Sequence, residues 1–564
     1  MDVYKSVVSH PVEPLMFAIL ILIVCLGCYL ASRIFLRIYQ FSVTKHHKPN
    51  NVPRLYPHID PFLGLDLAIQ TWRDFHNGEL SEGLRRRHAL YGRTFLTNNL
   101  GSDYIYTVEP ENIRAITTAQ FSNFGKSDWV SEAAKHVGNG VLMNEGEAWR
   151  QSRAMLKPVF ARTVVDEPTF MEPHVMRLVG EMKRLAGRED GEEVFDFHEL
   201  ACMFTLDVVT EFLFGKSTRC MGISKGVEGE EGMEFLSLVR RFEGPSGEFI
   251  AVGLLAWLEL LPSYRHLIGL VTGMKEWFHR KLDEIMAESH TVSASKTPRS
   301  VFTAMRAAGH SGDQIQGELQ NVFFASYDTT SAFLANLIYV LVRYPDVQAR
   351  LREEVDSLCG RSPSNHDLSK LEYLRLVVME ALRLYSPVSS HSRTARADTM
   401  LPRGGGPEGR NPIIVRAGAT VIWSTYSLNR DPQRYGEDWA QFRPERWTSL
   451  MRSRDTTSAT SEGDGDIVGG NTTCCATEIG AGKMGTCRHG EGGESWRGFF
   501  MPFGSGPRTC LGQQMVQTEV SYVVVRLLQE FSHLGMESGG KDKPFREARA
   551  VSLYNSDGVR ISVR

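Results

Sequence analysis

The sequence lacks several features that would identify a class of protein at first sight. It has no surplus of charge, because 63 basic residues stand against 66 acidic ones and leave a formal net charge of −3 over 564 residues. The field of the whole chain therefore gives no electrostatic reason to expect a nucleic-acid partner. The sequence has no internal repeat and no nucleotide-binding fingerprint for a flavin or a nicotinamide. Apolar residues make up 42% of the chain, which is ample for a large core.

Cysteine is scarce, with nine residues in the whole chain. Two lie in an N-terminal apolar run and most others are isolated, so they do not form the disulfide framework of a secreted domain. A reducing, cytosolic setting is the better interpretation. A metal site at Cys474, Cys475 and Cys487 is the less favoured reading of a glycine-rich stretch, because no spaced second pair of ligands is nearby.

Charge is absent from Pro14 to Ser32, a run close to the 20 or so apolar residues that span a bilayer core. We predict a single transmembrane anchor over residues 14–32, preceded by a luminal tail over residues 1–13. A cleaved signal peptide is the alternative, but its apolar region would be shorter and closed by a small-residue cleavage site. Basic residues gather after the run, so the positive-inside rule leaves the rest of the chain cytosolic.

Residues 33–62 are basic and carry Pro53, Pro57 and Pro61, which predicts a stiff hinge. We predict one domain over residues 63–564. A second apolar run at 248–262 predicts either a shallow membrane contact or a buried helix.

The fold class is predicted to be mostly α with small β-sheets. Amphipathic stretches at helical spacing dominate, as at 317–355 and 371–385, whereas alternating stretches at 94–108 and 411–425 predict small sheets. A glycine-rich insert at about 449–495 is too polar to bury much apolar area, which predicts a flexible surface loop. It holds the sole glycosylation sequon, at Asn471, where we expect no glycan if the domain is cytosolic.

The stretch FMPFGSGPRTCLG, residues 500–512, sets one cysteine, Cys510, among glycines with an arginine two residues before it. Such a cysteine is a metal ligand, a nucleophile or an apolar filler. A thiolate that ligates iron needs support from backbone N–H groups, and small neighbours let it lie close beneath a flat macrocycle. Apolar residues then recur at near-helical spacing from Val516 to Phe531, which predicts a helix after the loop.

Phe503, Gly506, Arg508, Cys510 and Gly512 complete the pattern Phe-x-x-Gly-x-Arg-x-Cys-x-Gly, which resembles the heme-binding signature of the cytochrome P-450 family of heme-thiolate monooxygenases. Further family signatures occur upstream in the expected order: WRQSR at 149–153, ASYDTTS at 325–331, EALR at 380–383 and FRPERW at 442–447. Together they span most of the chain. The resemblance implies the cytochrome P-450 fold, with the predicted anchor in front of it, and heme b as cofactor.

The resemblance also implies roles for particular residues. Cys510 would be the axial thiolate ligand of the iron. The expected cofactor-binding residues are Trp149, Arg153 and Arg393, which would reach the heme propionates, together with Phe503, Gly506, Arg508 and Gly512 around the ligand loop. Taken alone, Trp149 and Arg153 could equally be the edge of an amphipathic helix.

Two further sets follow from the same resemblance. Glu380 and Arg383 would join Arg446 in a buried triad, although by themselves they read as a surface ion pair. Asp328 and Thr329 would supply the acid and hydroxyl that deliver protons to the oxygen site. Family members usually have glycine where this chain has Ser326, whose hydroxyl we expect to bond back to a helix carbonyl.

The sequence around these motifs is similar to that of fungal alkane and fatty-acid hydroxylases. This implies insertion of one oxygen atom of O2 into a lipophilic substrate, with hydroxylation at or near a chain end as the first hypothesis. A tailoring oxidase of fungal secondary metabolism is the alternative, and a heme-thiolate isomerase the least favoured. Phe323, Phe324, Leu384 and Val388 lie where the family lines its pocket, although a generic core would use the same residue types.

Electrons must come from a separate protein, since the chain has no redox nucleotide fingerprint. By resemblance this partner is the membrane-bound NADPH-cytochrome P-450 reductase, with cytochrome b5 as a second candidate donor. The expected location is the endoplasmic reticulum membrane, held by the single anchor and in contact with lipid, with the catalytic domain cytosolic. Nucleic acid is not an expected partner.

Overall fold

The computed structural model describes residues 51–99, 101–127, 138–165, 168–187, 193–221, 228–252, 262–289, 300–452, 496–540, 543–548 and 550–564, together with residues 27 and 31. Most of the predicted anchor, residues 453–495 of the predicted insert and residues 253–261 of the second apolar run lie outside this set. Within the described ranges, no helix is long and apolar enough to cross a membrane.

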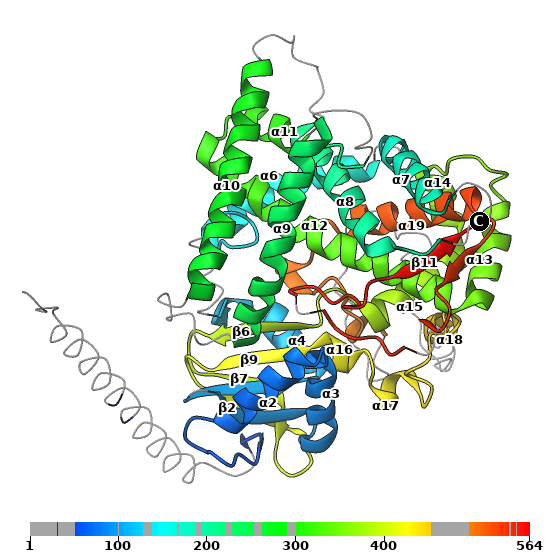
Figure 1. Cartoon of the computed structure of the whole chain (residues 1–564). Helices are drawn as coiled ribbons and strands as arrows, with labels where there is room; N and C mark the ends of the chain where they lie inside the picture. Colours follow the sequence, from blue (N-terminus) through cyan, green and yellow to red (C-terminus); the bar gives the residue numbers. More distant parts are fainter. Residues whose placement is uncertain are drawn as a thin grey trace, which may run out of the picture.

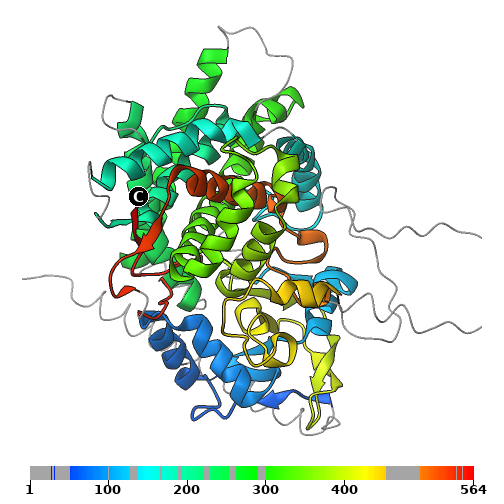
Figure 2. The same cartoon turned by 90° about the vertical axis from the view of Figure 1, so that its right-hand side faces the viewer.

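Helices dominate the molecule, and most of the strands lie on one side with α2 and α3 (Figures 1 and 2). The first half contains α2 (Leu65–His76), α3 (Leu80–Tyr91), α4 (Pro110–Arg114), η2 (Ala115–Ala119), α6 (Gly146–Val165), α7 (Glu172–Leu185), α8 (Phe197–Phe214), α9 (Glu228–Val252) and α10 (Pro262–Ser289). The second half contains α11 (Val301–Ala307), α12 (Gly312–Arg343), α13 (Pro345–Asp356), α14 (Asn365–Lys370), α15 (Glu372–Tyr385), α16 (Thr425–Leu428), α17 (Pro432–Tyr435), α18 (Arg446–Arg452) and α19 (Gln513–Glu530). The prediction of a mostly helical chain with small sheets is confirmed.

The largest sheet has six strands in the order β1-β2-β3-β9-β6-β4. These are β1 (Arg54–Leu55), β2 (Thr94–Asn99), β3 (Ser102–Thr107), β9 (Thr420–Ser424), β6 (Ser390–Ala395) and β4 (Phe124–Gly125). β2 and β3 form a hairpin with Thr94 opposite Thr107, and β3 then pairs in parallel with β9. Because β1 pairs with β2 through Arg54 and Phe95, the folded domain begins before residue 63 and takes in the end of the predicted hinge.

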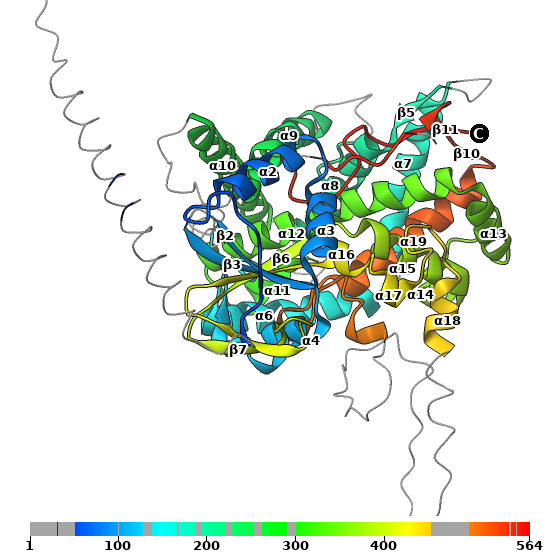
Figure 3. The same cartoon turned by 90° about the horizontal axis from the view of Figure 1, so that it is seen from below.

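Two smaller sheets complete the β structure of the described ranges. β7 (Thr399–Gly405) and β8 (Asn411–Val415) form an antiparallel pair. β11 (Arg560–Val563), near the end of the chain, lies between β10 (Leu534–Met536) and β5 (Phe195–Asp196). The C-terminal segment is therefore tied to the start of α8, which it approaches in Figure 3.

Helix α12 is the central element of the core and crosses the middle of the molecule (Figure 1). A capping box at Ser311 begins it, with the side chains and backbones of Ser311 and Gln314 bonded reciprocally, and the break before Pro345 ends it. Its first half, through Tyr327, packs in a cluster with α8, α9, α10 and α11. Its second half, from Phe333 onward, packs in a separate cluster with α15 and α19. The turn between the two clusters is left to face a cavity.

Candidate active site

A cavity of about 1200 Å³ lies beside this turn of α12. Its walls come from α12, α6, β6, β9 and the loop before α19, and it extends past α9 and α10 to α2. The predicted site residues that line it are Trp149, Arg153, Asp328, Thr329, Arg393, Phe503, Arg508, Cys510 and Gly512. These residues, which are spread over more than 350 positions of the sequence, therefore line one cavity.

Cys510 is held at the floor of the cavity by the backbone of its own loop. Its N–H donates to the carbonyl of Phe503 at 3.0 Å. Burial raises the pKa of the Cys510 thiol, while the Gly512 N–H and the charge of Arg153 lower it. Burial thus disfavours the charged thiolate unless a cation binds it. This environment suits a metal ligand better than a free nucleophile.

Gly506 shapes this loop for a steric reason. It has φ +70°, and a Cβ at this position would lie 1.9 Å from the carbonyl oxygen of Thr117. The loop and the π-helical turn η2 can therefore approach each other only if residue 506 has no side chain. Gly506 does not itself line the cavity. At Gly512 a Cβ would meet protein atoms only at ordinary contact distances, the nearest being Phe160 Cε1 at 3.5 Å.

Positive charge gathers at one end of the cavity, on Lys126, Arg153, Arg393 and Arg508. Arg508 lies over the ring of Trp149 at 4.3 Å and donates to the carbonyl of Asn144 at 2.7 Å. Arg153 donates to the carbonyl of Thr509 at 2.9 Å.

These cations repel one another. Burial and then the charge of Arg393 lower the pKa of Arg508 to about 10, and burial and then Arg508 lower that of Lys126 to about 7. Glu145 is the carboxylate that opposes both shifts. A ligand that brings carboxylates to this end would relieve the repulsion, so the site fits a heme, whose propionates these cations would hold and whose iron Cys510 would bind.

On α12, the polar side chains of Ser326, Asp328, Thr329 and Thr330 interrupt the apolar surface of the cavity. The hydroxyl of Thr329 donates to the carbonyl of Ala325 at 2.7 Å, and that of Ser326 donates to the carbonyl of Val322, as expected from the sequence. Asp328 instead accepts a hydrogen bond from the Ser552 hydroxyl at 2.5 Å. Burial raises the pKa of the Asp328 carboxyl, and this bond and the charge of His198 oppose the rise.

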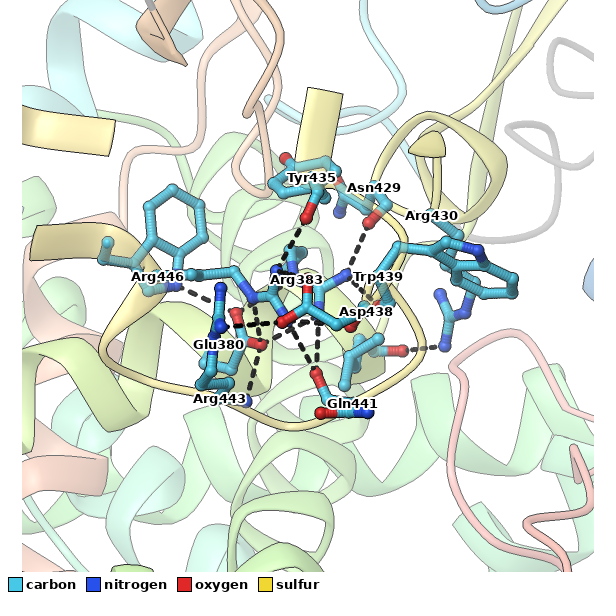
Figure 4. Close-up of polar contacts among 12 residues, drawn as sticks. Glu380, Arg383, Asn429, Arg430, Tyr435, Asp438, Trp439, Gln441, Arg443 and Arg446 are labelled. Carbon is cyan, nitrogen blue, oxygen red and sulfur yellow. Dashed lines mark hydrogen bonds and ion pairs between the residues drawn. The ribbon is translucent and has the colours of Figure 1, made fainter. Parts of the chain in front are cut away.

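The structure brings the three predicted triad residues together outside the cavity, where α15 meets the start of α18 (Figure 4). Arg383 donates to both oxygens of Glu380, at 2.9 and 2.8 Å, and Arg446 donates to one of them at 2.8 Å. Trp447 Nε1 also donates to the Glu380 carboxylate, to Oε2 at 3.0 Å. Remaining guanidinium N–H groups bond backbone carbonyls, including those of Asn429, Tyr435, Asp438, Trp439 and Gln441. With Glu380 and Arg383 fully buried, this is an internal lock and no surface pair.

The pocket residues divided into two groups. Phe324 and Val388 line the cavity, whereas Phe323 and Leu384 are buried in the core at 0% and 3% exposure. Their apolar character could not separate the two groups, because core and pocket use the same residue types.

Sequence reasoning missed four polar residues that also line or adjoin the cavity: Lys126, Glu243, Glu519 and Ser552. Glu519 is 4% exposed, and burial raises its pKa to about 8. The sequence offered one signal for Glu519: it is an acid placed among the regularly spaced apolar residues of α19. The other three carry no local pattern, because their positions depend on contacts far apart in the chain.

Comparison with known proteins agrees with this geometry. The profile of the family described as Cytochrome P450 matches residues 59–460 and 493–559. The chain is 30% identical over 542 residues to the Cytochrome P450 monooxygenase himC of Aspergillus japonicus, covering 93% of this chain and 86% of the relative. It is 31% identical over 528 residues to the Cytochrome P450 monooxygenase FPY7 of Fusarium mangiferae, with 90% and 88% covered. With Cytochrome P450 52A5 of Candida maltosa it shares 32% identity over 477 residues, covering 81% and 80%. The chain belongs to the cytochrome P450 family of monooxygenases, whose cofactor is heme b bound through a cysteine thiolate.

Proposed function

We propose that this enzyme inserts one oxygen atom of O2 into a long, lipophilic substrate, hydroxylating an alkane or fatty-acid chain at or near its end. The observation that carries the proposal is the shape and lining of the cavity. From Cys510 it passes the apolar side chains of Phe324 and Val271 and reaches Ile69 and Trp72 on α2, both 51% exposed. An apolar passage that runs from the ligand loop to the surface suits an extended hydrocarbon better than a compact polar molecule.

The roles of the residues follow from their positions. Cys510 would hold the iron, Trp149, Arg153, Arg393 and Arg508 would hold the propionates, and Phe503 and Gly512 would pack around the ligand. When bound, the heme supplies activation of O2 with electrons from outside. Thr329 would hold the last proton donor in the oxygen site, and Asp328 would pass protons to it. The apolar wall would keep water away from the reacting carbon.

The electron donor and location remain those implied by the resemblance. Separate delivery of electrons by NADPH-cytochrome P-450 reductase, with cytochrome b5 as a further donor, is supported by the absence of a redox nucleotide fingerprint in the sequence. Anchoring in the endoplasmic reticulum membrane by residues 14–32 is supported by the uncharged run there. Absence of a glycan at Asn471 in the expressed protein would fit a cytosolic domain, and a mobility shift on endoglycosidase treatment would contradict it.

Two measurements test the function. The reduced protein with carbon monoxide is expected to show the strongly red-shifted Soret band of a thiolate heme, and its absence would refute the heme-thiolate assignment. Reconstitution with reductase and a panel of alkanes, fatty acids and polyketide or terpenoid scaffolds then ranks the substrate classes. Preference for the scaffolds would replace chain hydroxylation by the tailoring-oxidase alternative, and conversion of a hydroperoxide without NADPH would indicate an isomerase.

A further inference from the structure

A cluster of polar and ionisable side chains lies beside Asp328. It is built by three separate parts of the chain: His198 on α8, Glu243 on α9, and Ser552 and Tyr554 near the C-terminus. The Tyr554 ring stacks on the His198 ring at 4.2 Å, and its hydroxyl lies 3.5 Å from Glu243 Oε2. Ser552 donates to Asp328, which joins the cluster to α12.

Glu243 has the character of a proton donor in this cluster. Burial, followed by the charges of Cys202 and Asp328, raises its pKa to about 8, while His198 and Arg240 oppose the rise. At neutral pH its carboxyl is therefore mostly protonated. His198, whose pKa burial lowers, is mostly neutral under the same conditions.

The cluster lies close both to the cavity and to a solvent-exposed edge of α9. Glu243 itself lines the cavity. On its outer side, Arg240, one turn earlier on α9, donates to Glu199 at 3.0 Å, and the Glu199 side chain is 54% exposed.

We propose that Glu243, with Tyr554 and His198 beside it, supplies the protons that Asp328 passes into the oxygen site. This rests on the proposed monooxygenase function. In the step, the O–H bond of the Glu243 carboxyl breaks and an O–H bond forms on the Asp328 carboxylate, with Tyr554, His198 or an ordered water as the bridge. Glu243 is left as a carboxylate and regains its proton from solvent along the edge by Glu199, so no oxidant or reductant is needed.

Asp328 needs such a supply because of where its carboxylate is bound. Its oxygen accepts from Ser552, on the side of the cluster, whereas the Thr329 hydroxyl is directed to Ala325. An acid that has given up its proton toward the cavity would therefore be reloaded from the cluster. Two rival roles for Glu243 are a contact with the substrate and a purely structural bond to Tyr554.

The experiment compares Glu243→Gln with Glu230→Gln, the same change at an exposed position on the same helix. In Glu243→Gln, product formed per NADPH consumed is expected to fall at least about threefold, with the difference appearing as hydrogen peroxide. The carbon monoxide band and the substrate dissociation constant, read from the spectral shift on binding, are expected to stay within about twofold of wild type. Glu230→Gln is expected to match wild type throughout.

A second readout does not depend on turnover. Infrared difference spectra of the wild type are expected to show carbonyl absorption of protonated carboxyls that disappears as pH rises through about 8. Glu243→Gln is expected to lose the part that belongs to Glu243, while the part that belongs to Glu519 remains. Coupling of the wild type is expected to fall over the same pH range, and Glu243→Gln is expected to be flat there.

The outcomes separate the claims. A wild type without the thiolate band refutes the proposed function itself. With the band present, unchanged coupling in Glu243→Gln overturns the proton supply and leaves the function standing. A weaker substrate affinity with unchanged coupling would instead make Glu243 a substrate contact, and also overturns the proposal. Tyr554→Phe, which keeps the stacked ring, is expected to show a smaller loss of coupling if its hydroxyl is the bridge, and none if water is.

Discussion

Arg446 Nε and Glu380 Oε1 meet at 2.8 Å although the two residues are 66 positions apart in the chain, and Glu380 is fully buried where they meet. Their bond fixes the start of α18 against α15, and each oxygen of the carboxylate already accepts hydrogen bonds. Substituting one of Glu380, Arg383 and Arg446 alone is costly, because it leaves a buried charge without its partner.

Glu380→Gln is therefore expected to destabilise the fold by about 3–5 kcal/mol, since two buried guanidinium groups lose their counter-ion. Denaturant unfolding of the purified domain measures this, and a low yield of folded protein would agree with it. Glu147→Gln breaks a pair in which both side chains are 67% exposed and is expected to change stability by less than about 0.5 kcal/mol. Equal effects of the two substitutions would contradict the internal lock.

Gly506→Ala should prevent the ligand loop from reaching η2, because the new Cβ would lie 1.9 Å from the Thr117 carbonyl oxygen. We expect poor heme incorporation, measured as the ratio of Soret to protein absorbance. Gly360→Ala is the control: it has φ +75° and nothing within 4 Å of its Cβ, and it does not line the cavity, so it carries only a backbone cost of about 1–2 kcal/mol. If the two variants bind heme equally well, steric closure at residue 506 is not what shapes the loop.

Thr329→Ala is expected to leave heme content, the carbon monoxide band and substrate binding nearly unchanged, since its hydroxyl bonds a helix carbonyl in the structure. Coupling should fall, because the cavity loses the group that holds the last proton donor. Ser331→Ala removes a hydroxyl bonded in the same way, to the carbonyl of Tyr327 at 2.9 Å, but away from the cavity. A ratio of product to NADPH that is the same in wild type and both variants would retire the relay role of Thr329.

Cys510→Ser replaces a soft anionic sulfur by a hard neutral oxygen and is expected to abolish both turnover and the red-shifted carbon monoxide band. Far-ultraviolet circular dichroism should remain that of the wild type, because the Cys510 backbone bond to Phe503 does not involve its side chain. Wild-type turnover by this variant would refute the ligand assignment.

His88 makes stability depend on pH. It is 7% exposed, and burial lowers its pKa from 6.5 to about 4, so it is neutral in the folded state. Between those values the unfolded chain binds more protons than the folded one, and stability contributed by the neutral ring falls as pH falls from about 6.5 toward 4, by a few kcal/mol at most. His88→Gln should show a shallower loss of unfolding free energy between pH 7 and pH 5 than wild type. Parallel pH profiles would show that the pKa of His88 is not lowered in the folded state.

The sequence-based predictions succeeded where local pattern determines structure. The stretch 317–355 was expected to be helical and is α12 followed by α13, broken at Tyr344 because Pro345 cannot continue the helix. The segment 371–385 is α15, and 94–108 is the β2–β3 hairpin. The motifs in the sequence were enough to name most of the candidate site residues that line the cavity.

Long-range pairing was beyond local pattern. The predicted strands in 411–425 enter different sheets, β8 pairing with β7 and β9 lying between β3 and β6. The direction of Asp328 depends on Ser552, which comes 224 positions later and has no motif of its own. Side chains such as Lys126 and Glu243 acquire their character from burial and neighbouring charge, and neither can be read from the residue type alone.

The segment that follows α19 bears directly on the catalytic chamber. β11 pairs with β5 at the start of α8, Ser552 bonds Asp328 on α12, and Val551 lines the cavity. A truncation that removed residues 550–564 would therefore take away part of the cavity wall and leave the Asp328 carboxylate without its Ser552 partner.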